Sequence, residues 1–375
     1  MSKSSIKTHY ILMFFLVGLM IIPFSNITKV FAQERVISII PVGDNPVGVA
    51  YNPSNKNVYV ANHGSNTVSV ISENNVVVDT IPVGESPFGI AYNANNKNMY
   101  VTNRESNTVS VISENNVVVD TIPVGESPFG IAYNADNKNM YVANLSSDTV
   151  SVIDGSNVVV DTIPVGNGPI GVAHNEGNGN MYVTNFISRS LSIIDENNVV
   201  VDTIAVRGLP SGVEYNPGNN NMYVTIFSSE SVLVLDENNV VVDTIAVEFS
   251  PFLIEYNPKN HYMYVTNEAS SSVSVIDQNN VVVDTIPVGT FPSGIAFNAG
   301  NSNMYVASSG LDAVFVIGKS TLPVDGIKGS GNNVNIQVQK NSGNIAGGQL
   351  GFGGTYSDSP IIQRQSANQD SSVVS

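Results

Sequence analysis

The chain has 375 residues and is acidic, with 15 Lys and Arg residues against 31 Asp and Glu residues and a formal net charge of −16. Such a charge repels the phosphate backbone of nucleic acids and anionic membrane surfaces, so nucleic acid is not an expected partner. Because the chain has no cysteine, disulfides, thiolate metal sites and a cysteine nucleophile are excluded.

Residues 1–32 have the pattern of a secretory signal peptide. Lys3 and Lys7 precede an apolar run over residues 11–24, and Val30-Phe31-Ala32 suits cleavage after the alanine. The run is short for a membrane span of about 20 residues. The alternative is an uncleaved N-terminal anchor. Both interpretations predict a secreted or cell-surface protein, and cleavage would leave no segment inserted in the membrane.

Between residues 35 and 318 the sequence repeats with a period of 41 residues. Tyr-Val followed by a small or polar residue occurs seven times at this interval. The tyrosines are Tyr59, Tyr100, Tyr141, Tyr182, Tyr223, Tyr264 and Tyr305. A period near 40 with strand signals and almost no helix signal is typical of a β-propeller, a ring of sheets called blades.

Each repeat contains four expected strands separated by turns rich in Asn, Gly, Ser, Asp and Pro. In the second repeat they cover residues 87–93, 98–103, 108–112 and 117–124, and are named a, b, c and d. The nearly continuous apolar character of strands c and d indicates that both of their faces pack against neighbouring blades.

The order of the strands predicts how the ring closes. Strands a, b and c occur seven times, but strand d follows only the first six repeats. Residues 35–43 match strand d and precede the first strand a. We therefore predict an all-β fold, a seven-bladed β-propeller of four-stranded antiparallel blades over residues 35–318. Its N-terminal strand completes the last blade and closes the ring.

Residues 319–375 are rich in Gly, Ser, Asn and Gln and have few large apolar side chains. This composition predicts a disordered tail or spacer. Residues 334–338 would suit a strand, but the sequence shows no partner for it.

The recurring Tyr-Val-Thr-Asn, Ile-Pro-Val-Gly and Asn-Lys-Asn-Met-Tyr sequences resemble the YVTN family of β-propeller repeats, over about three quarters of the chain. That family includes domains of archaeal surface-layer proteins. The resemblance implies a seven-bladed propeller, an exported protein and a cell-surface or interaction role. Related propellers include lactonase-like and haem d1-binding enzymes, but their active residues have no counterpart motif here. The fifth and seventh motifs depart from the pattern at Ile226 and Ser308, which questions the loop geometry there.

The two rims of such a propeller differ in sequence. The c-to-d turns are nearly identical, so we name the rim formed by the c-to-d and a-to-b loops the uniform rim. The d-to-a and b-to-c loops form the variable rim, where apolar residues gather. An exposed apolar cluster marks a contact site, whereas the alternative is that these side chains pack between the blades. The candidate partner-binding residues on this rim are Phe186, Arg189, Arg207, Phe227, Phe249 and Phe252.

Two neighbouring repeats carry glutamate, Glu214 and Glu255, where the other five have alanine. Strand a is the innermost strand of a blade, so these carboxylates are expected beside the central channel. There they would bind a cation, or one of them would have a raised pKa. The alternatives are two solvated side chains or a pair with Arg207.

Other candidate chemistry is weak. His63, His174 and His261 occupy different repeat positions without metal-ligand spacing, so no metal site is expected. Asp120 and its counterparts recur in strand d with the same neighbours, which indicates a structural role.

Two classes of function remain. The first is a monomeric binding scaffold that holds a protein or glycan partner at the cell envelope through its variable rim. The second is a lactonase- or lyase-like propeller enzyme with a pocket at the central channel and Glu214 and Glu255 as its acid-base groups. The scarcity of histidine, the absence of cysteine and the near-identity of the second and third repeats favour the scaffold, with no catalytic residue and no cofactor.

Overall fold

The computed structural model describes residues 34–319, 335–337 and 349–351. The expected signal peptide and its cleavage site, and most of the expected tail, lie outside the described residues. In the part that is described, no helix has the length and apolar character that crossing a bilayer requires.

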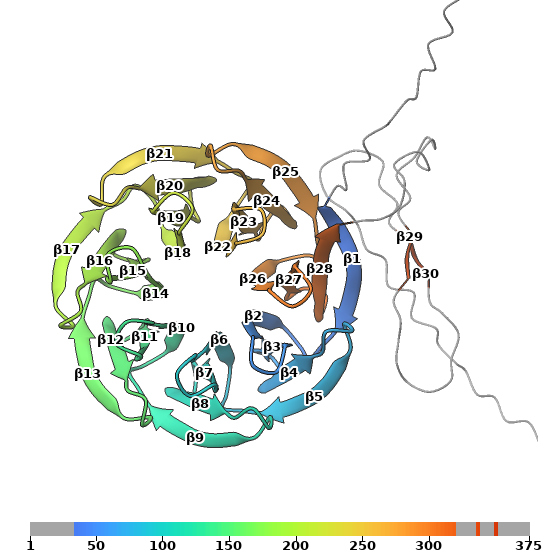
Figure 1. Ribbon diagram of the computed structural model, residues 1–375, viewed down its shortest axis with the longest axis horizontal. Coiled ribbons are helices and arrows are strands. Elements are labelled where there is room, and N and C mark those ends of the chain that lie inside the picture. The colour runs from blue at the N-terminus through green and yellow to red at the C-terminus, as the bar shows by residue number, and fades with distance from the viewer. Residues whose placement is uncertain (1–33, 320–334, 338–348, 352–375) are drawn as a thin grey trace, which may run out of the picture. The chain divides into compact units, whose positions relative to one another are not determined.

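Residues 34–319 form a closed ring of seven four-stranded antiparallel blades, which confirms the predicted fold (Figure 1). Blades 1 to 3 contain β2 (Pro46–Asn52), β3 (Asn57–Asn62), β4 (Thr67–Ile71), β5 (Val77–Pro82), β6 (Pro87–Tyr92), β7 (Met99–Asn103), β8 (Thr108–Ile112), β9 (Val118–Pro123), β10 (Pro128–Tyr133), β11 (Met140–Asn144), β12 (Thr149–Ile153) and β13 (Val159–Pro164). Blades 4 to 6 contain β14 (Pro169–His174), β15 (Met181–Asn185), β16 (Ser190–Ile194), β17 (Val200–Ala205), β18 (Pro210–Asn216), β19 (Asn221–Ile226), β20 (Ser231–Leu235), β21 (Val241–Ala246), β22 (Pro251–Asn257), β23 (Tyr262–Asn267), β24 (Ser272–Ile276) and β25 (Val282–Pro287). Blade 7 contains β26 (Pro292–Asn298), β27 (Asn303–Ser308), β28 (Ala313–Lys319) and β1 (Glu34–Pro41).

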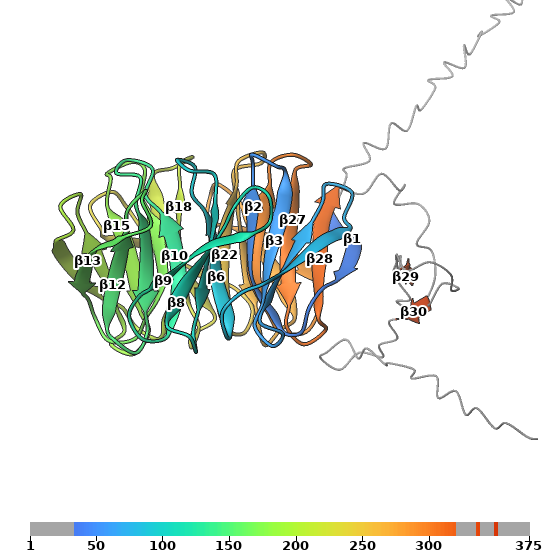
Figure 2. The same ribbon diagram turned by 90° about the horizontal axis from the view of Figure 1, so that it is seen from below.

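The first strand of the propeller completes the last blade, as predicted. β1 pairs antiparallel with β28, so that Ile39 lies opposite Phe315 and Pro41 opposite Ala313. The a strands surround the channel, the d strands lie on the circumference, and the loops form the two rims seen edge-on in Figure 2. Outside the propeller, β29 (Asn335–Gln337) pairs with β30 (Gln349–Gly351), a partner that the sequence did not reveal.

The tyrosine of each repeat links its own blade to the next. All seven tyrosine side chains are fully buried. The Tyr59 hydroxyl accepts a hydrogen bond from Asn55 Nδ2 (2.8 Å) and donates one to Asn116 Oδ1 in the c-to-d turn of blade 2 (2.6 Å). Asn116 also supplies the left-handed backbone conformation of that turn (φ 60°), which asparagine tolerates well. Turn geometry and blade-to-blade bonding therefore depend on the same residue, which explains why the uniform rim is uniform.

Six tyrosines bond an asparagine of the next blade in this way, and Tyr264 bonds Glu34 instead. Blade 7 has no c-to-d turn because its fourth strand is β1, and Glu34 at the start of β1 takes the place of the asparagine. Burial, followed by the hydrogen bond to Glu34, raises the pKa of Tyr264. Three aspartates of strand d join the same network, since Asp120 Oδ2 accepts from Asn157 Nδ2 at 3.0 Å, and Asp161 and Asp243 accept from Asn198 and Asn280. This contact gives them the structural role that their repetition indicated.

The expectation that strand d packs on both faces is wrong. Strand d lies on the circumference, where Val78 and Val119 are 57% and 56% exposed. In blade 2 the middle valine, the isoleucine and the last valine of the strand pack inward, as Val118, Ile122 and Val124. The valines on the outer face reflect the high strand propensity of β-branched residues rather than burial.

The departures at Ile226 and Ser308 are matched by changes at a second position. In blade 2, Asn103 Nδ2 donates to Thr108 Oγ1 (3.0 Å) and to Ser110 Oγ (2.9 Å) within the buried sheet. Blade 5 has Ile226 and Leu233 in place of the asparagine and the second hydroxyl, and blade 7 has Ser308 and Phe315. Blade 5 has thus exchanged a polar pair for apolar contacts, whereas Ser308 of blade 7 donates to the Thr290 carbonyl at 2.7 Å, and the strands keep their pairing in both blades.

We expect Ile226→Asn to lower the free energy of unfolding by about 2 kcal/mol, because a buried amide would find the Ser231 hydroxyl opposite it but Leu233 in place of the second hydroxyl. Adding Leu233→Ser should recover part of this loss by restoring the second acceptor. Urea unfolding of both single variants and the double variant measures the coupling as a double-mutant cycle. Strictly additive effects would contradict the proposed pairing.

Candidate functional site

The variable rim is built from b-to-c loops bonded to d-to-a loops, as the assignment of the rims predicted. In blade 1 the His63 amide donates to the Asn45 carbonyl (2.9 Å), and the Gly64 amide donates to the Asp44 carbonyl (3.0 Å). The channel opens inside this ring of loops. Its mouth is surrounded by the second residue of each strand a and the first residue of each b-to-c loop.

Phenylalanine rings from opposite sides of the propeller meet over this mouth. Phe88 and Phe129 follow the first proline of β6 and β10, and their ring centroids are 3.8 Å apart. Phe252 occupies the same position in β22, on the opposite side of the channel (Figure 1). Its ring packs edge-on against both others at 6.4 Å. The three rings therefore contact one another across the axis.

Two further phenylalanines continue this contact around the rim. Phe227, from the b-to-c loop of blade 5, lies 6.3 Å from Phe252, and Phe186, from blade 4, lies 6.2 Å from Phe227. We name Phe88, Phe129, Phe186, Phe227 and Phe252 the phenylalanine cluster. Five blades thus contribute one ring each to a continuous apolar surface at the mouth of the channel.

A cavity of about 130 Å³ lies in the channel, lined by the a strands of all seven blades and by Phe88, Phe129 and Phe252. Glycine allows these strands to approach closely. A Cβ atom on Gly89 would lie 2.3 Å from the Phe129 carbonyl oxygen. Thr102 Oγ1 donates to that same oxygen at 2.7 Å and so bonds blade 2 to blade 3. Blade 6 has Leu253 at the glycine position, and this side chain also lines the cavity.

The structure brings together three of the residues that the sequence proposed for partner binding, namely Phe186, Phe227 and Phe252. Phe249 is 56% exposed and has no ring contact with the cluster. Arg189 and Arg207 are exposed on the rim. In the described part of the chain, Lys56 lies within ion-pair distance of Glu73, and no such pair joins Arg207 to Glu214.

Sequence reasoning missed Phe88, Phe129 and Arg104. The near-identity of the second and third repeats had counted against a specialised pocket there, yet these repeats supply two of the five rings. A usable signal was present, because the residue after the first proline of strand a differs between blades. It is Val47, Phe88, Phe129, Ile170, Ser211, Phe252 or Ser293.

Arg104 begins the b-to-c loop of blade 2 and stacks on the cluster. Its guanidinium carbon lies 5.2 Å from the centroid of the Phe129 ring and 5.7 Å from that of Phe88. His63, at the same position in blade 1, meets Phe88 edge-on at 6.4 Å. Burial lowers the pKa of His63, and the positive charge of Arg104 lowers it further, while Glu105 opposes the change.

Glu214 and Glu255 lie further along β18 and β22, toward the uniform rim. Both side chains are half-buried, and neither lines the cavity. Glu255 Oε1 accepts a hydrogen bond from the Phe297 amide of blade 7 at 3.2 Å. In the described part of the chain, no three His, Cys, Asp or Glu side chains converge in a way that could hold a metal ion.

Dense protein surroundings raise the pKa of both carboxyls, although each keeps some surface open to the channel. For Glu214 the causes are burial and then the negative charges of Glu255 and Glu176. For Glu255, burial raises the pKa to about 7, and the bond from Phe297 opposes this rise. The pair can therefore hold and release a proton near neutral pH.

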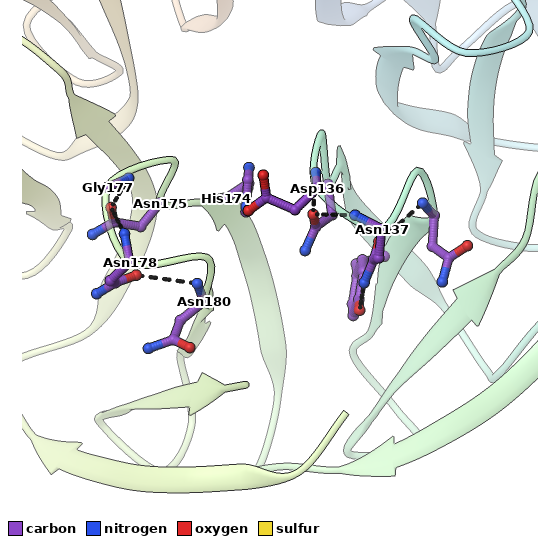
Figure 3. A network of polar contacts seen from close by, with 10 residues as sticks. Asp136, Asn137, His174, Asn175, Gly177, Asn178 and Asn180 are labelled. Carbon is purple, nitrogen blue, oxygen red and sulfur yellow. Dashed lines mark hydrogen bonds and ion pairs between the residues drawn. The ribbon is translucent and has the colours of Figure 1, made fainter. Parts of the chain in front are cut away.

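His174 replaces the tyrosine that ends strand a in five other blades. Its Nε2 lies 3.1 Å from Asp136 Oδ2 in the a-to-b loop of blade 3, and the two side chains point toward each other in Figure 3. In blade 2, Tyr92 bonds Ser54 of blade 1 in the equivalent way at 2.6 Å. The histidine thus makes a contact between blades.

No protein-family model matches the chain, and no curated protein matches it. Solved structures do resemble it. Hydrazine synthase from Kuenenia stuttgartiensis is similar with a TM-score of 0.67 at 19% identity, over 74% of this chain and 96% of that one. A streptogramin B lyase has a TM-score of 0.66 at 13% identity, over 77% and 97% of the two chains. Virginiamycin B lyase from Staphylococcus aureus has a TM-score of 0.67 at 11% identity, over 76% and 99%. At these identities the likeness shows the fold alone, so the chain is a seven-bladed β-propeller.

Proposed function

We propose that this protein is an exported, monomeric binding scaffold of the YVTN type, which holds a protein or glycan partner at the cell envelope through its variable rim. The observation that carries the proposal is the phenylalanine cluster at the mouth of the channel. Large aromatic side chains supply most of the energy of many interfaces, and grouped apolar surface at a rim marks a contact site. The exposed Phe249, Phe291 and Ile187 on the same rim enlarge the apolar surface.

A second candidate function, a propeller enzyme, is favoured by the raised pKa of Glu214 and Glu255, since a carboxyl that titrates near neutral pH suits acid-base catalysis. The similar lyase and synthase structures belong to enzymes, but at identities that support only the fold. Neither glutamate lines the cavity, which favours the scaffold. For a propeller enzyme that uses these carboxyls, Glu214→Gln should abolish catalytic turnover and leave partner binding unchanged.

Replacing Phe227 by alanine should weaken partner binding by about 2 kcal/mol, roughly 30-fold, because truncation of an aromatic anchor removes its contact area. The measurement is capture of a partner from the cell envelope by the immobilised propeller, with Phe252→Ala as a second variant. The control is Val119→Ala, which truncates an apolar side chain that is 56% exposed on the circumference, away from the rim. If both cluster variants keep their thermal unfolding temperature and still capture as well as the control, the variable rim is not the binding site.

A further inference from the structure

We infer that the group bound at the channel mouth is an apolar group of about one ring that carries a carboxylate, and that Arg104 binds this carboxylate. This inference deepens the proposed function and rests on it, because it concerns the same rim. The inference rests on three observations, which are the unpaired donor of Arg104, the charges around this arginine and the size of the cavity.

The guanidinium of Arg104 is held by stacking, and no described residue supplies an acceptor for its buried Nε. It stacks on Phe88 and Phe129, and its Nε is buried without a hydrogen-bond partner. No carboxylate of the described residues lies within ion-pair distance of it, although the chain has 31 acidic residues. Buried donors in native proteins are nearly always paired, and Nε is such a donor, while the two terminal nitrogens of the guanidinium carry four more N–H groups. An acceptor on a ligand would satisfy these donors.

The surroundings of Arg104 favour a single negative charge. Glu85 and Glu105 lie exposed beside it, in loops joined by the bond from the Glu105 amide to the Glu85 carbonyl (3.3 Å). Two nearby carboxylates repel a dianionic phosphate more strongly than a monoanion. The planar guanidinium also matches the geometry of a carboxylate, to which it can donate two parallel hydrogen bonds. A monocarboxylate is therefore the anion that fits best.

The cavity sets the size of the apolar part. It measures about 130 Å³ and is lined by the Phe88, Phe129 and Phe252 rings and by aliphatic side chains of the a strands. An engineered apolar cavity of about 150 Å³ binds benzene, so this one accepts about one ring or a branched aliphatic group. Because Arg104 stacks on rings that line the cavity, one ligand can reach both. Such chemistry occurs in small aromatic acids and at the C-terminus of a protein that ends in an apolar residue.

Four probes test the inference by titration calorimetry. They are 3-phenylpropionate and its neutral amide, and the peptide acetyl-Ala-Ala-Phe as a free acid and as an amide. We expect the intact protein to prefer an acid over its amide by at least about tenfold. Preference in the small-acid pair or in the peptide pair identifies the source of the carboxylate, and either supports the inference.

Arg104→Met keeps the apolar stem on the rings but removes the charge, so it should abolish the preference for the acid and leave binding of the amide unchanged. Lys259→Met, which removes an exposed positive charge from the uniform rim, is the control and should keep the preference. Arg104→Gln is a second variant if the methionine variant unfolds. An arginine that only covers the rings would not produce this split between acid and amide.

Equal affinity for acid and amide in the intact protein would overturn the inference, as would a preference that survives both Arg104 variants or the failure of all four probes to bind. None of these results would by itself remove the proposed function. That proposal fails separately, if Phe227→Ala and Phe252→Ala leave envelope-partner capture intact.

Discussion

Deleting β1 (Glu34–Pro41) is expected to abolish the cooperative thermal unfolding of the propeller. The deletion leaves β28 as an unpaired edge and removes Ile40, which is 4% exposed and packs in the cluster between blades 7 and 1. It also removes Glu34, the acceptor for the buried Tyr264 hydroxyl. An open ring exposes sheet edges that pair with other chains, so we expect aggregation or a broad unfolding transition.

A variant in which the closing strand is supplied at the other end of the chain distinguishes ring closure from the mere loss of residues. It begins at Asp44 and carries, after Ile317, the c-to-d turn and strand d of blade 2, residues 113–125. This turn restores an asparagine that can accept from Tyr264, as Asn116 does for Tyr59. Circular dichroism on heating should show a sharp unfolding transition for the variant with the added strand and not for the variant that only lacks β1. A deletion variant that melts as sharply as the parent would refute closure by β1.

Replacing Glu255 by glutamine should stabilise the protein at alkaline pH by at most about 3 kcal/mol. Burial raises the pKa of Glu255 to about 7, so the folded state holds its proton more tightly than the unfolded state does. The parent protein therefore loses stability as the pH rises from the unfolded pKa, near 4.5, through about 7, at about 1.4 kcal/mol per unit of pKa difference. Glutamine has no charge and keeps an oxygen that can accept from the Phe297 amide.

Urea unfolding at about pH 5 and about pH 8 measures this effect. The parent should be less stable at the higher pH, and the difference should shrink in Glu255→Gln and shrink further when Glu214→Gln is added. Glu237→Gln, which neutralises an exposed glutamate in a c-to-d turn, is the matched control and should keep the pH dependence of the parent. A pH dependence that is the same in all four proteins would show that neither carboxyl is destabilised by burial.

The fold could be predicted from the sequence because each blade repeats the same local signals. Turn residues such as Asn116 and strand residues such as Tyr100 recur at one interval. Ring closure was indicated because one strand d precedes the first repeat and none follows the last. Burial within a blade was harder to predict, because the pattern of strand d does not show that it lies on the circumference. Val119 has the same residue type as a core valine but faces solvent.

The candidate site could be predicted only in part. Phe186, Phe227 and Phe252 stood out because they lie in blades 4 to 6, whose rim loops differ in sequence from those of the other blades. Phe88 and Phe129 occupy the same position as Phe252 but lie in two nearly identical repeats, and so looked like scaffold. Their contact with Phe252 joins residues more than 120 positions apart and depends on the curvature of the ring, which no local pattern records. The bond from the Phe297 amide to Glu255 likewise depends on how two a strands approach each other at the channel.

Closure by the first strand also has a consequence for synthesis. β1 leaves the ribosome before any other strand of the propeller, and β28 follows about 280 residues later. At roughly 5 to 20 residues per second, the two are separated by about 15 to 55 s of translation. Throughout that interval the isoleucine-rich first strand has no partner within its own chain, so newly made molecules are most vulnerable to mispairing with one another before the seventh blade emerges.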